Sequence, residues 1–165
     1  MSEAPISRGD LLGLVVLLSL AGVAVSGYLT WQWYESAGSS WCDFSSYFSC
    51  SRVRESPFAA VSGIPTSVVG VAGFLVLLAL SSLIFVGRTA IGPVPIAPAL
   101  LTFAGVGAAI GAGLTVIEVF VIRAVCLLCA LGFAIDLVIL GIVFILWRGT
   151  DRLDPLHGNE EVLRP

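Results

Sequence analysis

The chain has no lysine, a single histidine and few charges of either sign. Its 165 residues include eight arginines and eleven acids, and 12% of all residues are charged, which is about half the share found in soluble domains. The arginines are scattered, so no basic patch indicates a nucleic-acid partner. The histidine, His157, lies in the polar C-terminal tail, which excludes a histidine-based metal centre among the apolar segments. We therefore expect neither a nucleic-acid partner nor a metal.

Apolar residues make up 58% of the chain and gather in four stretches of the length that a lipid bilayer requires. They predict an all-α membrane protein, a bundle of four transmembrane helices over about residues 11–33, 64–86, 99–122 and 124–147. This gives one membrane domain, residues 1–148, and a polar tail, residues 149–165, that we expect to be disordered. A signal peptide is the alternative for the first stretch, because Ala24-Val25-Ser26 resembles a cleavage site. That apolar run is too long for a typical signal peptide and its leader is hardly basic, which favours a helix.

The long loop between the first two helices, residues 34–63, is rich in aromatic side chains. The rings in it and at its edge are Trp31, Trp33, Tyr34, Trp41, Phe44, Tyr47 and Phe48. Such rings prefer the lipid–water boundary, so we expect the loop to lie on the membrane surface. Residues 56–61 are a candidate short interfacial helix. Ser62 is a candidate N-cap for the second transmembrane helix, with Pro65 in its first turn.

The four cysteines form two pairs in the sequence. Cys126 and Cys129 make a C-x-x-C motif at the start of the fourth helix. The unpaired amides and the positive end of the helix dipole favour a thiolate on the first sulfur, so the pair can cycle between dithiol and disulfide. The alternative is two small apolar residues without redox chemistry. The second sulfur lies about 4.5 Å deeper along the helix than the first.

Cys42 and Cys50 lie in the aromatic loop, on the same side of the membrane as the C-x-x-C motif. They are either a structural disulfide that pins the loop or a mobile pair that exchanges electrons with a partner outside. A zinc site built from all four cysteines is a further alternative. The seven residues between Cys42 and Cys50 fit it poorly, because such sites usually combine two close C-x-x-C pairs.

Two acids lie within the apolar stretches, where carboxylates are costly and face the bundle interior or water. Glu118 is within reach of Arg123 and can be structural. Asp136 lies seven residues beyond Cys129, two helical turns along the same face, where it either hydrogen-bonds a neighbouring helix or handles protons. In the third stretch, the small residues Gly107 and Gly111 allow a neighbouring helix to approach closely.

The distribution of arginine predicts the orientation. With the N-terminus inside, five arginines lie inside (Arg8, Arg88, Arg148, Arg152, Arg164) and three lie outside (Arg52, Arg54, Arg123). This topology also places all four sulfurs outside, in an oxidising compartment suited to disulfide chemistry. We therefore expect an integral protein of a prokaryotic plasma membrane, with both termini cytoplasmic and the cysteines on the outer face.

Together, the cysteine spacings resemble those of the vitamin K epoxide reductase family. The resemblance rests on the loop pair, the string Cys50-Ser51-Arg52-Val53, Ser56 six residues after the second loop cysteine, and the C-x-x-C that opens the fourth helix. It covers about residues 10–148. The start of the second helix, Gly63-Ile64-Pro65, is similar to the prokaryotic members of the family.

The resemblance implies a membrane thiol–disulfide oxidoreductase whose four helices surround a quinone, such as menaquinone, ubiquinone or another vitamin K-like quinone, and which supports disulfide formation in exported proteins. Electrons would pass from a thioredoxin-fold protein to Cys42 and Cys50, and then from Cys50 to Cys126. Cys129 would face the quinone ring, and Ser56 would act near the active pair. No thioredoxin domain follows Trp147, so we expect this partner to be a separate protein.

Two positions of the implied quinone pocket depart from the animal members of the family. Those members have an asparagine near the start of the second helix, where this chain has Thr66. They have a tyrosine four residues after the second active cysteine, where this chain has Phe133. Both departures favour a plain respiratory quinone over an epoxide.

Two other functions remain open at this stage. One is a non-enzymatic membrane scaffold with a disulfide-stapled loop. The other is a quinone-coupled thiol oxidase of the unrelated bacterial bundle family, which carries both cysteine pairs in extramembrane loops. The position of Cys126 and Cys129 at a helix start argues against the second of these.

Overall fold

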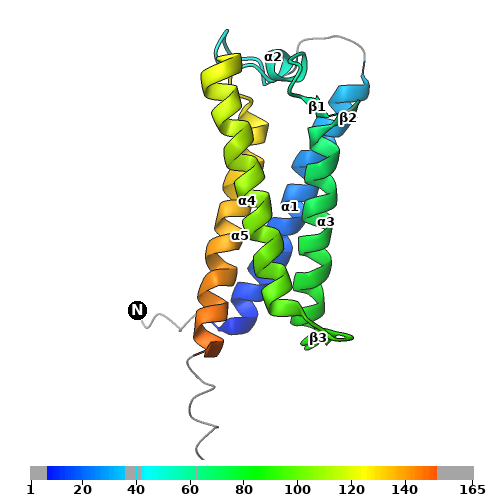
Figure 1. Ribbon diagram of the computed structural model, residues 1–165, viewed down its shortest axis with the longest axis vertical. Coiled ribbons are helices and arrows are strands. Elements are labelled where there is room, and N and C mark those ends of the chain that lie inside the picture. Colours follow the sequence, from blue (N-terminus) through cyan, green and yellow to red (C-terminus); the bar gives the residue numbers. More distant parts are fainter. Residues whose placement is uncertain (1–6, 36–39, 41, 62, 152–165) are drawn as a thin grey trace, which may run out of the picture.

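The computed structural model describes residues 7–35, 40, 42–61 and 63–151. Four long helices run up and down beside one another (Figure 1): α1 (Arg8–Tyr34), α3 (Thr66–Phe85), α4 (Ile96–Val116) and α5 (Leu127–Asp151). α4 continues into a π-helical segment, η1 (Ile117–Ile122). Helix α1 packs against α3 and α5, and α4 packs against α3 and α5. The four-helix bundle expected from the sequence is confirmed.

The outer surface of the bundle is apolar over the length of a membrane. All four helices are long and apolar enough to cross a bilayer. Large apolar side chains point outward, among them Leu17, Val116 and Phe120, which are 64%, 55% and 74% exposed. In water such a surface would be unfavourable, whereas lipid tails accommodate it. The protein is therefore an integral membrane protein.

Local capping explains where α1 and α3 begin. Helix α1 starts at Arg8, earlier than expected, because Ser7 and Asp10 form a capping box with hydrogen bonds of 3.2 and 3.0 Å. Helix α3 starts at Thr66, later than expected, because the two preceding residues belong to a hairpin of β1 (Ala60–Val61) and β2 (Ile64–Pro65). Ser62, the expected N-cap, lies outside the described residues, as does the tail from residue 152 onward.

The link between α3 and α4 is a short hairpin of β3 (Ala90–Ile91) and β4 (Val94–Pro95), with Gly92 at φ 59° in its turn. Helix α4 follows at once from Ile96, three residues before the expected start. Pro98 does not delay it, because a proline in the first helical turn removes an amide that has no intrahelical partner.

The loop between α1 and α3 contains a short helix, but its position differs from the expected one. Helix α2 spans Cys50–Arg54 instead of residues 56–61. Ser49 caps it, with its Oγ accepting a hydrogen bond from the amide of Arg52 at 3.3 Å. The loop lies over one end of the bundle, and the described N-terminal end of α1 lies at the other (Figure 1).

Aromatic side chains surround the end of the bundle that carries α2. Trp31 and Tyr34 at the end of α1 are 63% and 73% exposed, and Phe44, Tyr47 and Phe48 of the loop are also exposed. Trp41 lies outside the described residues. Such rings mark the lipid–water boundary, which supports the expected position of the loop at the membrane surface.

A buried apolar core lies in the half of the bundle remote from α2. Its buried cluster consists of Val15, Phe74, Leu77, Leu100, Ala104, Ile139 and Val143. Helices α1 and α3 approach closely above it, because Gly22 lies directly against the ring of Phe74 and leaves no room for a Cβ atom. This half anchors the bundle, and the other half holds the cysteines.

Candidate thiol redox site

The four cysteines lie at the same end of the bundle in two chemical states. Cys42 and Cys50 form a disulfide with a Cα–Cα distance of 6.0 Å, whereas Cys126 and Cys129 are free thiols. Cys42, Cys50 and Cys126 are buried in one apolar cluster with Leu128, and Cys129 packs against it. The two pairs expected from the sequence are therefore brought together.

Backbone pairing aligns the loop with the segment before α5. The amide of Val125 donates to the carbonyl of Tyr47 at 2.8 Å, and the amide of Ser49 donates to the carbonyl of Val125 at 3.2 Å. These bonds flank an isolated parallel bridge between Phe48 and Val125. The bridge delays the start of α5 to Leu127, three residues after the expected position, because residue 125 is held in an extended pairing.

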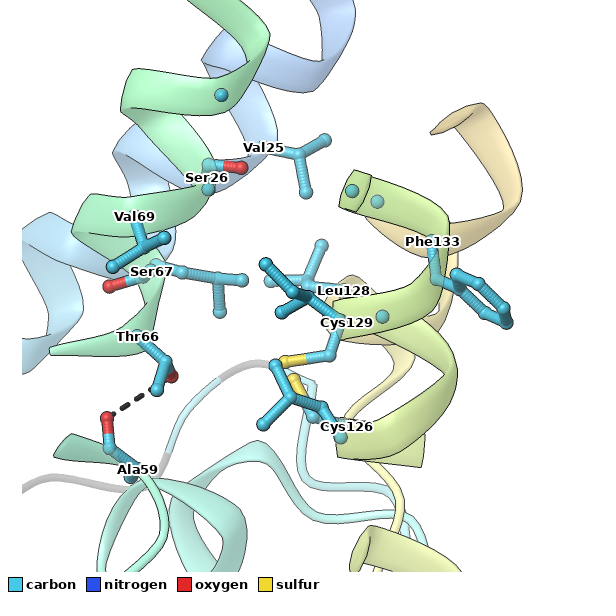
Figure 2. Close-up of a pocket in the computed structure, with 18 of the residues that line it drawn as sticks. Val25, Ser26, Ala59, Thr66, Ser67, Val69, Cys126, Leu128, Cys129 and Phe133 are labelled. Atoms are coloured by element: carbon cyan, nitrogen blue, oxygen red, sulfur yellow. Dashed lines mark hydrogen bonds between the residues drawn. The ribbon is translucent and has the colours of Figure 1, made fainter. Parts of the chain in front are cut away.

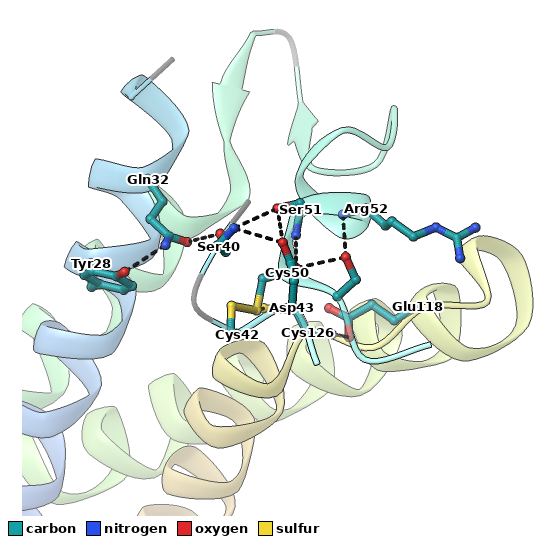
Figure 3. The surroundings of a disulfide bond; sticks show 11 residues. Tyr28, Gln32, Ser40, Cys42, Asp43, Cys50, Ser51, Arg52, Glu118 and Cys126 are labelled. Carbon is teal, nitrogen blue, oxygen red and sulfur yellow. Dashed lines mark hydrogen bonds between the residues drawn. A yellow bond between two sulfur atoms is a disulfide. The ribbon is translucent and has the colours of Figure 1, made fainter. Parts of the chain in front are cut away.

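The same bridge brings one loop sulfur to the C-x-x-C motif. Cys50 directly follows Ser49 and Cys126 directly follows Val125, so the two cysteines leave the bridge side by side. Their Sγ atoms are 2.9 Å apart (Figure 3). Cys126 is thus in contact with the disulfide sulfur of Cys50, the arrangement that thiol–disulfide exchange requires.

Asp43 organises the disulfide loop (Figure 3). Its carboxylate accepts hydrogen bonds from the Ser40 amide at 2.9 Å, the Ser49 hydroxyl at 2.9 Å, and the Ser51 amide and hydroxyl at 3.1 and 2.6 Å. Desolvation acts to raise the pKa of Asp43, but the bonds from Ser51, Ser49 and Ser40 outweigh it and lower the pKa to about 2. The carboxylate therefore stays charged and holds both ends of the loop.

The loop is also fixed to the end of α1. The Oε1 atom of Gln32 accepts from the Ser40 hydroxyl at 3.0 Å, and the Gln32 carbonyl accepts from Nη1 of Arg54 at 2.8 Å. The Nε2 atom of Gln32 donates to the Tyr28 hydroxyl at 2.8 Å. Gln32 therefore links the disulfide loop, α2 and α1.

Glu118 supports the start of α5 from the π-helical end of α4. It is buried, with 5% of its surface exposed, and its Oε2 accepts a hydrogen bond from the Cys126 amide at 3.1 Å. A carboxylate at a helix N-terminus binds an otherwise unpaired amide and complements the helix dipole. The suggested pairing with Arg123 is not present in the described structure. Arg123 is exposed and turns the chain with φ 54°.

The environment of Cys126 favours its thiolate. A hydrogen bond with the Cys129 side chain is the main cause that lowers the pKa of Cys126, and burial acts in the opposite direction. Backbone amides at the start of α5 act with the hydrogen bond. The thiol of Cys126 therefore ionises more readily than an ordinary cysteine thiol.

A cavity of about 640 Å³ opens between the four helices directly beneath the cysteines. Cys50, Cys126 and Cys129 line its loop end, and Phe74 and Leu77 line it towards the packed cluster. Figure 2 shows the C-x-x-C side chains across the cavity from Thr66 and Val69 of α3. Its size is typical of sites that hold a small organic molecule.

Thr66 and Phe133, the two residues expected in the quinone pocket, and Ser56, expected to act near the active cysteines, all line this cavity. The Ser56 hydroxyl donates to the carbonyl of Val53 at 2.7 Å, so it secures the turn after α2 and contacts no sulfur. The Thr66 hydroxyl donates to the carbonyl of Ala59 at 3.1 Å (Figure 2).

The last two helices meet through small residues of α4. A Cβ atom on Gly111 would lie 2.5 Å from the ring of Phe133, and one on Gly107 would lie 2.8 Å from Oδ2 of Asp136. The expected close approach at this glycine pair is thus present. Of the two roles suggested for Asp136, the hydrogen bond to a neighbouring helix is not found among the described residues, because neither carboxylate oxygen has a partner.

Sequence reasoning missed the roles of Asp43, Gln32 and Val125. Asp43 had a usable signal, since an acid beside Cys42 in a serine-rich stretch is typical of a turn that binds backbone amides. Gln32 and Val125 had none, because their roles come from contacts between segments far apart in the sequence. Within the described ranges, no group of three or more histidine, cysteine or acidic residues is arranged to hold a metal.

Four membrane helices, a disulfide loop docked on a C-x-x-C motif and a cavity beneath them define a membrane thiol oxidoreductase. The model of the vitamin K epoxide reductase family matches residues 13–144, and the chain belongs to this family. The match includes all four cysteines and nearly all of the bundle, which confirms the resemblance found in the sequence. No curated protein sequence matches the chain at a significant level.

Proposed function

We propose that this protein oxidises the thiols of a separate protein outside the membrane and passes the electrons to a membrane quinone. The observation that carries this proposal is the 2.9 Å contact between Sγ of Cys126 and Sγ of Cys50, at the mouth of the cavity that Cys129 lines. One route thus leads from the membrane surface through the loop disulfide to the cavity.

The first step takes place at the loop. A thiolate of the partner attacks Cys42, which forms a mixed disulfide and releases the Cys50 thiolate. The second thiol of the partner then attacks this mixed disulfide, so the partner leaves with a disulfide and Cys42 leaves as a thiol. A partner with a thioredoxin fold supplies such a closely spaced pair of thiols.

The second step passes the two electrons inward. The Cys50 thiolate attacks Cys126 of an oxidised C-x-x-C pair, forms a Cys50–Cys126 bond and releases Cys129 as a thiol. Cys42 then attacks Cys50, which restores the loop disulfide and leaves Cys126 and Cys129 reduced. The observed arrangement, an oxidised loop above a reduced C-x-x-C, corresponds to the end of this step.

The cavity fits a quinone head group by its volume and its apolar lining. About 640 Å³ lies between the helices, with few polar groups among many apolar ones. A bound quinone accepts two electrons and two protons, which are those released when Cys126 and Cys129 close their disulfide. Cys129 lines the cavity one turn deeper than Cys126, so its sulfur is the one placed to meet the acceptor.

The pocket residues support a plain respiratory quinone, such as menaquinone or ubiquinone. Phe133 carries no polar group, and the Thr66 hydroxyl is committed to the carbonyl of Ala59. The hydrogen bonds that animal members place at these positions are therefore missing here.

For the orientation, we place the termini in the cytoplasm and the cysteine loop outside the plasma membrane of a prokaryote. The excess of arginine that the sequence assigns to the inner side, five against three, supports this placement.

Two variants test the route. In Cys129→Ala, Cys126 can still attack the loop disulfide at Cys50 and release Cys42 as a thiol, but no Cys129 remains to displace Cys50 from Cys126. We therefore expect the bond between Cys50 and Cys126 to accumulate and quinone reduction to cease. In Cys126→Ala, the adduct disappears. Non-reducing gels with mass spectrometry measure the adduct, and absorbance measures quinone reduction. Quinone reduction at the parent rate by Cys129→Ala would refute the proposal.

Labelling tests the orientation separately. A thiol reagent that cannot cross membranes is expected to modify the reduced Cys42 and Cys50 in intact cells. Labelling only after permeabilisation would reverse the assigned orientation and leave the chemistry of the route intact.

A further inference from the structure

Asp136 is a buried acid without a partner in the wall of an apolar cavity. It lies in α5 with 5% of its surface exposed and lines the cavity. Neither carboxylate oxygen has a hydrogen-bond partner in the part of the chain that the structure describes. An ionised carboxylate left unpaired in apolar surroundings is so costly that the group is held as the neutral acid instead. A neutral carboxyl is an O–H donor, so this site offers a hydrogen bond that the protein itself does not use.

The fold makes room for this acid at some expense in packing. Gly107 of α4 lies against it, and a Cβ atom there would come within 2.8 Å of Oδ2. Any larger residue at position 107 would therefore displace the carboxyl group. One turn further along α4, Gly111 similarly makes room for Phe133. The acid thus occupies a space created by a glycine and is not a chance substitution on an outer surface.

Several other polar side chains along the cavity already have partners. The hydroxyls of Ser56 and Thr66 donate to the carbonyls of Val53 and Ala59. The hydroxyl of Thr115 donates to the carbonyl of Gly111 at 2.8 Å. Each of these protons is committed to the backbone. The carboxyl of Asp136 differs from them because both of its oxygens lack a partner.

The position of Asp136 relative to Cys129 suits a ligand that has a polar group at each end. Seven residues of helix separate the two, which is about 10 Å along the axis, and both side chains line the same cavity. Helical side chains lean towards the N-terminus, so the carboxyl reaches back towards the sulfur. A para-quinone carries one oxygen at each end of its ring.

We propose that Asp136 binds the ring oxygen remote from Cys129 of a para-quinone, by donating a hydrogen bond from its neutral carboxyl group. This inference rests on the proposed function and adds the residue that fixes the head group at the far end of the cavity. Asp136 then determines affinity for the quinone and takes no part in the exchange between Cys50 and Cys126.

The proposal is tested by measuring how tightly the purified protein binds decylubiquinone and menadione. Quenching of tryptophan fluorescence reports the binding. Asp136→Leu removes the donor at similar volume, and we expect its Kd to rise about tenfold, as for the loss of one hydrogen bond to a ligand. Asp136→Asn keeps an N–H donor, and its Kd is expected to stay within about threefold of the parent. The matched control is Thr102→Val, which removes a hydroxyl of α4 that donates to the carbonyl of Pro98 at 2.9 Å and does not line the cavity, and we expect its Kd to be unchanged.

Gly107→Ala gives a second route to the same result. This substitution keeps the carboxyl group of Asp136 but shifts its position. The Kd is therefore expected to rise although Asp136 itself is unchanged. The melting temperature of Asp136→Leu is expected to equal or exceed that of the parent, because an orphaned buried acid is replaced by an apolar group. A structural role for Asp136 would instead lower it.

The outcomes separate this inference from the proposed function. If the parent binds quinone and Asp136→Leu binds it equally well, the inference is overturned and the proposed function stands. An equal loss of affinity in Asp136→Leu and Asp136→Asn also overturns it, because a retained donor would then not matter. If the parent binds no quinone at all and Cys129→Ala accumulates no adduct, the proposed function itself fails.

Discussion

The two halves of the bundle are built from the same four helices but differ in how their interior is filled. In the half remote from the loop, Val15, Leu100 and Ile139 are fully buried in one packed cluster. In the half beneath the loop, the same helices enclose about 640 Å³. Side-chain volume contributes to this difference, since five glycines line the cavity. These glycines are Gly70, Gly73, Gly107, Gly111 and Gly132.

This comparison shows how a small membrane bundle separates stability from chemistry. The packed half supplies close van der Waals contacts, which drive helix association when lipid removes most of the hydrophobic effect. The hollow half gives up such contacts to admit a ligand beside the cysteines. Phe74 and Leu77 lie at the boundary, because they belong to the packed cluster and also line the cavity.

The largest effect on stability is expected from truncation in the packed half. Ile139→Ala removes a fully buried side chain and is expected to lower the free energy of unfolding by about 2–5 kcal/mol. Val106→Ala in the cavity wall, where the valine is 52% exposed, is expected to change it by only about 0.5 kcal/mol. Unfolding of the purified protein in mixed micelles measures both. Equal losses of unfolding free energy in the two variants would show that the packed half contributes no more to stability than the hollow half.

Adding a methyl group provides the converse experiment. Gly22→Ala places a Cβ atom against the ring of Phe74 and is expected to destabilise the protein by about 1–3 kcal/mol. Gly73 lines the cavity and has open space around the position of a Cβ atom. Gly73→Ala is therefore expected to stabilise the protein by about 0.4–1 kcal/mol, because alanine lowers the conformational entropy of the unfolded chain. The same unfolding assay decides, and a gain of stability in Gly22→Ala would contradict the close contact of α1 and α3.

A smaller effect is expected at Glu118, which lies in the hollow half. Glu118→Ala leaves the Cys126 amide without its acceptor and is expected to cost about 1 kcal/mol, as for the loss of a helix cap. Exchange between Cys50 and Cys126 is also expected to slow, because the start of α5 is less well fixed. Glu118→Gln keeps a carbonyl acceptor and is expected to restore most of the exchange rate, measured by rapid quenching and gel analysis. An identical exchange rate in the two variants would show that Glu118 does not position Cys126.

The features that follow from local sequence were predictable. Apolar length predicts the four helices, and the cysteine spacings predict the two pairs and the family. The first residue of a helix was less predictable where a segment distant in the sequence pairs with the residues before it. Helix α5 starts at Leu127 because Val125 pairs with Phe48, and nothing in the local sequence marks that pairing.

The details of the site depend on contacts that cross the chain. Glu118 reaches the Cys126 amide only because η1 and the left-handed Arg123 turn the chain back on itself. The cavity depends on glycines of three helices facing the same space, and sequence periodicity does not determine how neighbouring helices rotate relative to one another. Asp136 was recognised as an intramembrane acid, but its lack of a partner is visible only in three dimensions.

The smallest effect is expected from pH, and it is confined to the loop. The pKa of Asp43 is lowered from 3.8 to about 2, so its carboxylate stabilises the docked loop fully above about pH 3.8 and this contribution is lost as the pH falls through about 2. The packed cluster contains no titratable group, so its amides are expected to keep their protection over the same range. Hydrogen exchange of residues 42–50, compared with that of α5 near Ile139, measures the difference. In Asp43→Asn the group no longer titrates, and the dependence of loop protection on pH between about 4 and 2 is expected to disappear. A dependence that persists in this variant would assign the titration to another group.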